Sequence, residues 1–186
     1  MNEYNAIMEA METGSGGRTT LAGKTYRPNP RVAMALRVQA TTGLRVGDVL
    51  ALRLDSFVKE NGRYRFNGVI EQKTKKVRNF PVPIEVVDDL REYAKKHGIA
   101  DNEPLFDLNT RAVQKYLLVI TDDLGIKDIS THSFRKLFAS EIYRKSAHNI
   151  ELVRRLLQHS SAQTTQRYLG ITDDELEQAL LNHNLM

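Results

Sequence analysis

The chain has 186 residues, 41% hydrophobic and 27% charged, a balance typical of one sizeable globular domain or a domain with an arm. It contains no cysteine, which excludes disulfides, thiolate metal sites and cysteine nucleophiles. No apolar stretch approaches the roughly 18 residues of a membrane helix, and the first residues lack the basic-then-apolar pattern of a signal peptide. We therefore expect a cytoplasmic protein.

Charge is unevenly distributed along the chain. The net charge is +4, but residues 59–78 and residues 131–168 each hold seven basic and two acidic side chains. The last 18 residues hold four acidic side chains and no Lys or Arg. Two basic blocks favour a polyanionic partner, most commonly nucleic acid. Two solvated charged faces are the alternative that charge alone leaves open.

The N-terminal part reads as two helices separated by a long loop. Residues 3–11 predict a short helix, and the polar, Gly-rich residues 12–29 predict a loop. Asn29 followed by Pro30 predicts the start of the next helix, because Pro at the first helical position has no N–H to lose. Gly43 predicts the end of that helix.

A second short helix is expected over residues 46–52, where apolar residues recur at helical spacing. Arg45 and Asp48 then lie one turn apart. One interpretation of Asp48 is a surface charge paired with Arg45, which would be structural support for the helix.

The pattern changes to strands over residues 56–82, where three antiparallel strands are expected. Asn61-Gly62 is a strong two-residue hairpin signal. The second turn is expected over residues 73–76, with Lys73 at the end of a strand beside this basic turn. Pro81 and Pro83 are expected to end the sheet.

The rest of the chain reads as helices. They are expected over residues 84–97, 112–124, 133–143 and 150–157, with a capping-box signature at 172–175 that opens a last helix. The fold class is therefore α+β, mostly helical with a small three-stranded antiparallel sheet.

Five short motifs carry the chemistry when they are taken together in chain order. They are Thr42-Gly43-Leu44-Arg45-Val46-Gly47-Asp48, Lys73-Thr74, His132-Ser133-Phe134-Arg135, Leu157-Gln158-His159-Ser160-Ser161 and Thr164-Thr165-Gln166-Arg167-Tyr168. Over nearly its whole length the chain resembles the catalytic domain of the tyrosine recombinases, the phage integrase family. The resemblance implies the fold of DNA breaking-rejoining enzymes.

The resemblance also implies a role for each matching residue. The implied catalytic residues are Arg45, Lys73, His132, Arg135, His159 and Tyr168, with Asp48 as structural support. Among them, Arg45 and Arg135 are the implied catalytic arginines, Lys73 the mobile hairpin lysine and Tyr168 the nucleophile. Further DNA contacts are expected from Lys75, Lys76, Arg78 and Lys136.

Two positions depart from the family pattern, and two threonines before Tyr168 allow more than one role. Gln158 stands where the family usually has glycine, and Lys136 where a histidine commonly follows the second arginine. Thr164 and Thr165 either cap or pack the tyrosine's helix or touch phosphate, and we expect packing.

The chemistry of DNA cleavage also requires residues of these types. Cleaving a phosphodiester without metal or water requires a nucleophile, positive charge on the phosphate and an acid for the leaving oxygen. A tyrosine hydroxyl has a pKa near 10, so Tyr168 needs neighbouring cations and a base. Two arginines can hold both non-bridging phosphate oxygens, and a lysine in a flexible turn can protonate the leaving 5′ oxygen. The sequence has no nucleotide-binding loop and no carboxylate cluster for Mg²⁺, so no cofactor is expected.

We expect a site-specific DNA recombinase of the integrase type, acting through a 3′-phosphotyrosyl intermediate in integration, excision or inversion. The alternatives are a type IB-like topoisomerase activity and a non-catalytic DNA-binding module with the same fold. The expected organisation is one catalytic domain over 1–186, with a C-terminal tail helix over 171–186 and no N-terminal core-binding domain. The expected partners are double-stranded DNA and other copies of the chain, in a tetrameric synapse formed through the tail. Packing of the tail on its own domain is the alternative.

Overall fold

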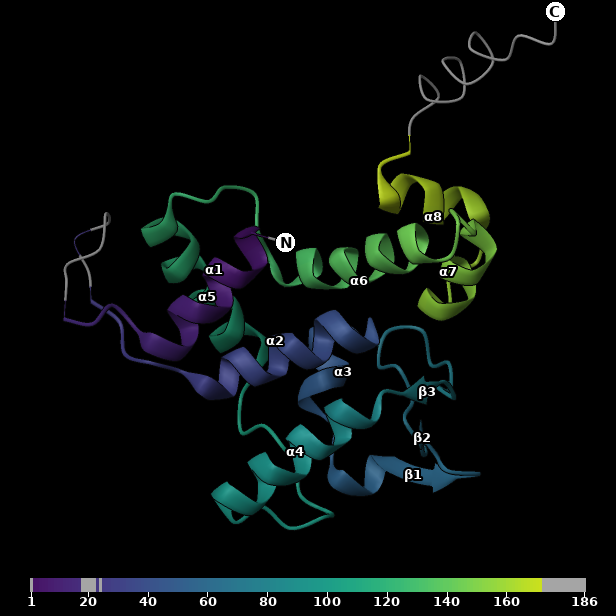
Figure 1. Ribbon diagram of the computed structural model, residues 1–186, viewed down its shortest axis with the longest axis horizontal. Coiled ribbons are helices and arrows are strands. Elements are labelled where there is room, and N and C mark those ends of the chain that lie inside the picture. The colour runs from purple at the N-terminus through teal and green to yellow at the C-terminus, as the bar shows by residue number, and fades with distance from the viewer. Residues whose placement is uncertain (1, 18–22, 24, 172–186) are drawn as a thin grey trace, which may run out of the picture.

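The fold is mostly helical, with one small sheet (Figure 1). The computed structural model describes residues 2–17, 23 and 25–171. In chain order these residues form α1 (Asn2–Thr13), α2 (Pro30–Thr42), α3 (Val46–Leu50), a 3-10 turn (Leu54–Ser56), β1 (Phe57–Glu60), β2 (Arg63–Phe66), β3 (Pro81–Val82), α4 (Ile84–His97), α5 (Thr110–Leu124), α6 (Thr131–Lys145), α7 (Ile150–Leu157) and α8 (Ala162–Leu169). The α+β class is confirmed. The helix expected from residue 172 onward lies outside the described residues.

The helix boundaries follow local chemistry. The Asn29 side chain accepts a hydrogen bond from the Val32 backbone N–H at 3.2 Å, which satisfies one of the free donors at the start of α2. Gly43 ends α2 in the left-handed conformation, with φ +66°. None of the helices in the described part of the chain is long and apolar enough to cross a lipid bilayer.

The three strands form one antiparallel sheet in the order β1-β2-β3. Asn61 and Gly62 both have positive φ in the turn between β1 and β2, as the sequence predicts. The prediction that Pro81 ends the sheet is wrong, because Pro81 lies in β3 opposite Arg65. Proline is tolerated there because β3 is an edge strand, where a missing N–H costs no ladder bond. Pro83 does end the sheet and precedes α4.

The second turn belongs to an excursion between β2 and β3. Ile70 and Val77 form an isolated antiparallel bridge, and residues 71–76, here named the lysine turn, lie between them. Lys73 therefore lies inside the turn, not at the end of a strand as predicted.

The helices bury two separate apolar clusters. The main one lies between α1–α5, the sheet and the start of α6, which together we call the body. The second is small and joins the later part of α6 to α7 and α8, with Ala139, Val153 and Leu157 at its centre. Figure 1 shows α6 running from the body to this pair of helices. We call α7 and α8 with their connection, residues 150–169, the arm.

Candidate active site

Arg45 lies at the junction of α2 and α3, on the side that faces the lysine turn. It is the residue that precedes the first turn of α3, with extended backbone at φ −71° and ψ 150°. Leu44 before it is fully buried, which fixes the backbone of the junction. The Arg45 side chain is 22% exposed, and its Nη1 donates to Glu71 Oε2 at 2.5 Å. Part of the guanidinium thus remains open to solvent.

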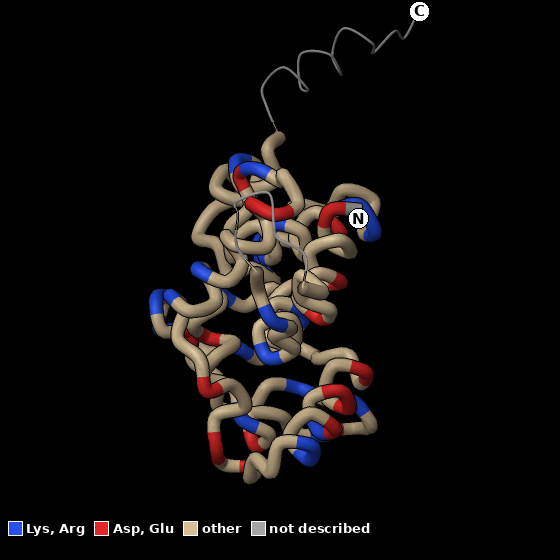
Figure 2. Tube along the Cα trace, turned by 90° about the vertical axis from the view of Figure 1, so that its left-hand side faces the viewer, with Lys and Arg blue, Asp and Glu red and all other residues tan. Residues whose placement is uncertain are grey.

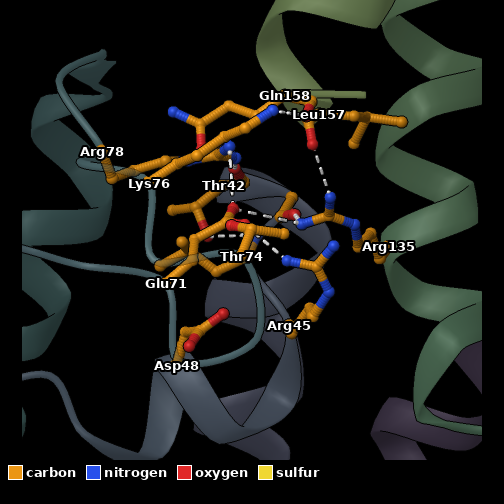
Figure 3. A network of polar contacts seen from close by, with 12 residues as sticks. Thr42, Arg45, Asp48, Glu71, Thr74, Lys76, Arg78, Arg135, Leu157 and Gln158 are labelled. Atoms are coloured by element: carbon orange, nitrogen blue, oxygen red, sulfur yellow. Dashed lines mark hydrogen bonds and ion pairs between the residues drawn. The ribbon is translucent and has the colours of Figure 1, made fainter. Parts of the chain in front are cut away.

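Glu71 is the centre of the site, and sequence reasoning did not single it out. Its side chain is fully buried and lies among three guanidinium groups (Figure 3). Besides the Arg45 bond, it accepts hydrogen bonds from Thr74 Oγ1 at 2.8 Å and Arg78 Nη1 at 3.2 Å. Arg135 Nη1 is 3.8 Å from Glu71 Oε1. Burial acts to raise the pKa of Glu71, but the Thr74 hydrogen bond and the three arginines outweigh it and lower that pKa. The carboxylate is therefore charged and organises the arginines around it.

Arg135 is fixed by two helix ends. It lies on α6 and is 2% exposed. One of its terminal nitrogens donates to the Gly43 carbonyl at the end of α2, and the other donates to the Leu157 carbonyl at the end of α7, at 2.8 Å. Burial, with the nearby Arg45 charge, lowers the pKa of Arg135. Because these two carbonyls belong to the body and to the arm, Arg135 joins the two.

Arg78 does not lie on the surface, so its predicted contact with DNA is wrong. The residue is 1% exposed, and besides Glu71 it donates to the Thr42 carbonyl at 3.1 Å. Its guanidinium also lies 5.1 Å from the centre of the Phe80 ring. Burial lowers the pKa of Arg78 to about 10. Arg78 is a buried partner of Glu71 that supports the site from behind.

Asp48 joins α3 to the lysine turn. Its Oδ1 accepts a hydrogen bond from the Gln72 backbone N–H at 2.8 Å, and Gln72 Nε2 donates back to the Gly47 carbonyl at 3.3 Å. Asp48 is 4% exposed, so the alternative of a surface charge is wrong. Burial raises the pKa of Asp48 in spite of the Gln72 hydrogen bond. Asp48 therefore supports the lysine turn as well as α3.

The lysine turn carries three exposed cations, Lys73, Lys75 and Lys76. Its base is held by the Glu71 and Gln72 contacts described above. Lys76 Nζ donates to the Gln158 carbonyl at 2.8 Å. Within the described residues, Lys73 makes no ion pair, and it is exposed two residues after Glu71.

His159 and Tyr168 face each other on the arm. Their rings meet edge to face, with centres 5.3 Å apart and planes at 78°. His159 Nδ1 lies 3.1 Å from the hydroxyl of Thr165, which is fully buried. This confirms packing for Thr165 and adds a hydrogen bond that orients the imidazole. Burial, with the Arg135 and Arg45 charges, lowers the pKa of His159 to about 4, so the ring is neutral at neutral pH.

The Tyr168 hydroxyl points to the start of α6, where it donates to the His132 carbonyl at 3.4 Å. Burial raises the pKa of Tyr168, while the charges of Arg135 and Arg45 oppose that rise. His132 and Lys136 are exposed on α6. The structure therefore brings Tyr168, His159, His132 and both arginines together within one chain. Such a set places positive charge beside a phenol, as attack on a phosphate requires.

Comparison with known proteins gives a consistent answer. The sequence profile of the phage integrase family matches residues 1–175. A probable integrase/recombinase, YoeC of Bacillus subtilis, is 31% identical over 140 residues, which cover 72% of this chain and 74% of that protein. Tyrosine recombinase XerA of Pyrococcus furiosus is 28% identical over 155 residues, which cover 78% of this chain and 52% of XerA.

Solved structures share the fold. The XerH site-specific recombinase in a pre-cleavage complex with difH substrate matches with a TM-score of 0.67 and 22% identity, over 98% of this chain and 53% of that one. The catalytic domain of bacteriophage HP1 integrase matches with a TM-score of 0.61 and 20% identity, over 99% of this chain and 93% of that domain. This chain thus spans about half the length of XerA and XerH. On the family profile and the relative in Bacillus, the chain belongs to the phage integrase family of tyrosine recombinases.

Proposed function

We propose that this chain acts as the catalytic domain of a site-specific DNA recombinase, with Tyr168 as the nucleophile. The observation that carries the proposal is the position of the Tyr168 ring, 5.3 Å from the His159 ring and under the charges of Arg135 and Arg45 of the same chain. A tyrosine buried only for packing needs no cations beside its hydroxyl. The chain therefore supplies its own nucleophile to its own phosphate-binding groups.

In the proposed step, Tyr168 Oη attacks the phosphorus and forms a 3′-phosphotyrosyl bond, while the bond from phosphorus to the 5′ oxygen breaks. Arg45 and Arg135 stabilise the charge that builds on the non-bridging oxygens. Because Glu71 neutralises one of the three guanidiniums around it, the cluster keeps a net positive charge for a phosphate. Neutral His159 donates or accepts one hydrogen bond at the same centre.

Two proton transfers complete the step. The phenol proton leaves toward the start of α6, where the Tyr168 hydroxyl donates to the His132 backbone carbonyl, and the His132 ring is the proposed base. Lys73 gives a proton to the departing 5′ oxygen. Because the ester keeps the energy of the broken bond, the free 5′ hydroxyl of a partner strand can reverse the reaction without ATP.

Double-stranded DNA is the proposed partner. Solved structures with the same fold include recombinases bound to DNA, such as XerH with difH. Figure 2 shows Lys and Arg spread over the described part of the trace with Asp and Glu between them, so the site and not the overall charge marks the DNA-binding face. Lys75, Lys76 and Lys136 are exposed around the site and are proposed to contact phosphates. Self-association through the acidic C-terminal residues stays a prediction of the sequence.

The test is covalent trapping. The protein is incubated at low salt with a pool of short duplexes, each nicked near the cleavage position so that the released 5′-hydroxyl fragment diffuses away. The reaction is stopped with SDS, and the DNA attached to protein is sequenced. Tyr168→Phe should abolish attachment. Tyr143→Phe is the matched control, because Tyr143 packs in the same small cluster outside the site and should attach DNA like the wild type.

The outcomes separate the candidate functions. Attachment enriched for one sequence supports a site-specific recombinase, whereas attachment without sequence preference supports the topoisomerase alternative. Equal, low attachment by the wild type and Tyr168→Phe, with DNA binding retained, would refute the catalytic proposal in favour of a binding module.

A further inference from the structure

Gln158 occupies a position where its own backbone is unfavourable. It lies between the end of α7 and His159 in the left-handed conformation, at φ 56° and ψ 33°. Glycine adopts this conformation freely, whereas a residue with a side chain adopts it at a cost. A non-glycine residue held there points to a side chain with a task of its own.

The side chain and the backbone of Gln158 both bind the lysine turn and the residue after it. Gln158 Nε2 donates to the Val77 carbonyl at 2.8 Å, and the Gln158 carbonyl accepts from Lys76 Nζ at 2.8 Å. Figure 3 shows Gln158 and Lys76 side by side above the Glu71 cluster. These two bonds connect adjacent residues of one segment to a single residue of the arm, and we call them the clamp.

The clamp holds a segment that apolar packing does not hold. The base of the lysine turn is fixed on the body by Glu71 and Gln72. After the turn, Val77 is 60% exposed and forms an isolated bridge with Ile70, which is 56% exposed. Backbone hydrogen bonds from Glu71 N–H to the Lys76 carbonyl at 3.0 Å and from Arg78 N–H to the Val69 carbonyl at 2.7 Å join the two sides of this excursion to each other. At the tip of the excursion, where apolar burial is small, the two hydrogen bonds to Gln158 fix Lys76 and Val77 to the arm.

From these contacts we infer that Gln158 is a positioning residue, which sets the lysine turn relative to the nucleophile. The inference rests on the proposed function. Lys73 precedes Lys76 by three residues and Tyr168 follows Gln158 by ten, so the clamp joins the segment of the proton donor to the segment of the nucleophile. Tyr168 attacks the phosphorus on the side opposite the 5′ oxygen, and Lys73 protonates that departing oxygen. Their separation is therefore set across the clamp, and loosening it should impair proton delivery by Lys73 more than attack by Tyr168.

The first test measures the clamp without DNA. Gln158→Gly removes the Nε2 bond and places glycine where the backbone favours it, so folding is not put at risk. Hydrogen–deuterium exchange, followed by mass spectrometry, is compared for the peptide that covers residues 70–80. We expect exchange about three- to tenfold faster than in the wild type, which corresponds to the net free energy of one hydrogen bond. Lys75→Met is the matched control, because it removes a charge from the same turn and leaves both clamp bonds in place. Equal exchange in Gln158→Gly and the wild type would overturn the inference.

The second test asks which step the clamp serves. Cleavage rates are measured on a nicked duplex of natural chemistry and on one whose leaving 5′ oxygen is replaced by sulfur. A thiol has a pKa of about 8.5, so the sulfur leaves without a proton donor. We expect Gln158→Gly to cleave the natural duplex about three- to tenfold more slowly, and the sulfur duplex at the wild-type rate.

The remaining outcomes are distinct. An equal loss on both duplexes means that Gln158 acts through the arm or the arginines, which overturns the inference. No covalent complex from the wild type refutes the proposed function itself. In that case, faster exchange in Gln158→Gly would show that the clamp holds the lysine turn without any catalytic role. The inference that Gln158 positions a proton donor would then be overturned together with the proposed function.

Discussion

Replacing Glu71 by Gln tests the electrostatic centre of the site. The substitution keeps the shape of the side chain and removes its charge. In the wild type the buried carboxylate accepts from Arg45 at 2.5 Å, Thr74 at 2.8 Å and Arg78 at 3.2 Å. An amide has one oxygen acceptor in place of two, and its NH₂ group would face a guanidinium donor. Buried positive charges would then lack their partner.

Removing one partner of a buried ion pair costs about 3 to 5 kcal/mol. For a domain of this size, 1 kcal/mol shifts the melting temperature by about 2 to 4 °C. We therefore expect Glu71→Gln to melt about 6 to 20 °C below the wild type, measured by calorimetry at neutral pH. Glu60→Gln is the matched control. Glu60 is exposed and 3.9 Å from Arg65, so its loss should cost less than about 1 kcal/mol.

The dependence on pH gives a second reading of the same contact. The pKa of Glu71 is lowered on folding, so its contribution is complete above the ordinary value of 4.5 and is lost as the pH falls through the lowered pKa. The gap between the wild type and Glu71→Gln should therefore narrow in acid. A gap at neutral pH no larger than that of the Glu60 control would refute the central role of the Glu71 charge.

Three further predictions concern backbone, pH and a helix end. Gly43→Ala should destabilise the protein by about 2 to 4 kcal/mol in denaturant unfolding, because its φ is +66° and a Cβ there would meet the Phe138 ring at 2.4 Å. Gly62→Ala, also at positive φ but with open space around it, should cost less, and an equal cost would contradict the steric argument. The pKa of His159 falls from 6.5 to about 4 on folding, so the unfolded chain binds more protons than the folded chain between these pH values. The free energy of unfolding should therefore decrease as the pH is lowered from 6.5 to about 4. That decline should be absent from His159→Gln in the same titration. Asn29→Ala should cost about 1 kcal/mol in thermal unfolding, and no measurable loss would mean that its cap bond contributes nothing.

Much of the fold could be predicted because its signals are local. Asn29 and Gly43 mark the ends of α2 through hydrogen bonds and backbone angles that involve only near neighbours. The turn at Asn61-Gly62 follows from the same kind of preference. The extent of β3 could not be predicted, because its two residues form a strand only through pairing with β2, and a proline within so short a segment does not indicate pairing.

The candidate site divides in the same way. The motif pattern named Arg45, Arg135, His159 and Tyr168, and the structure brings these four together. The pattern did not name Glu71, although an acidic residue just before the basic run of residues 73–78 is the signal that could have drawn attention to it.

Local sequence signals predict where most helices begin and end, the presence of a basic turn, and the order of the residues that mark the family. Which charges of the segment 71–78 face inward depends on tertiary packing. Glu71 and Arg78 are buried against each other, whereas Lys75 and Lys76 remain exposed. All four side chains are charged, so the sequence alone does not distinguish the buried pair from the exposed pair. The free energy that separates them comes from desolvation and from partners distant in sequence, such as Arg135 on α6, and these exist only once the helices have packed.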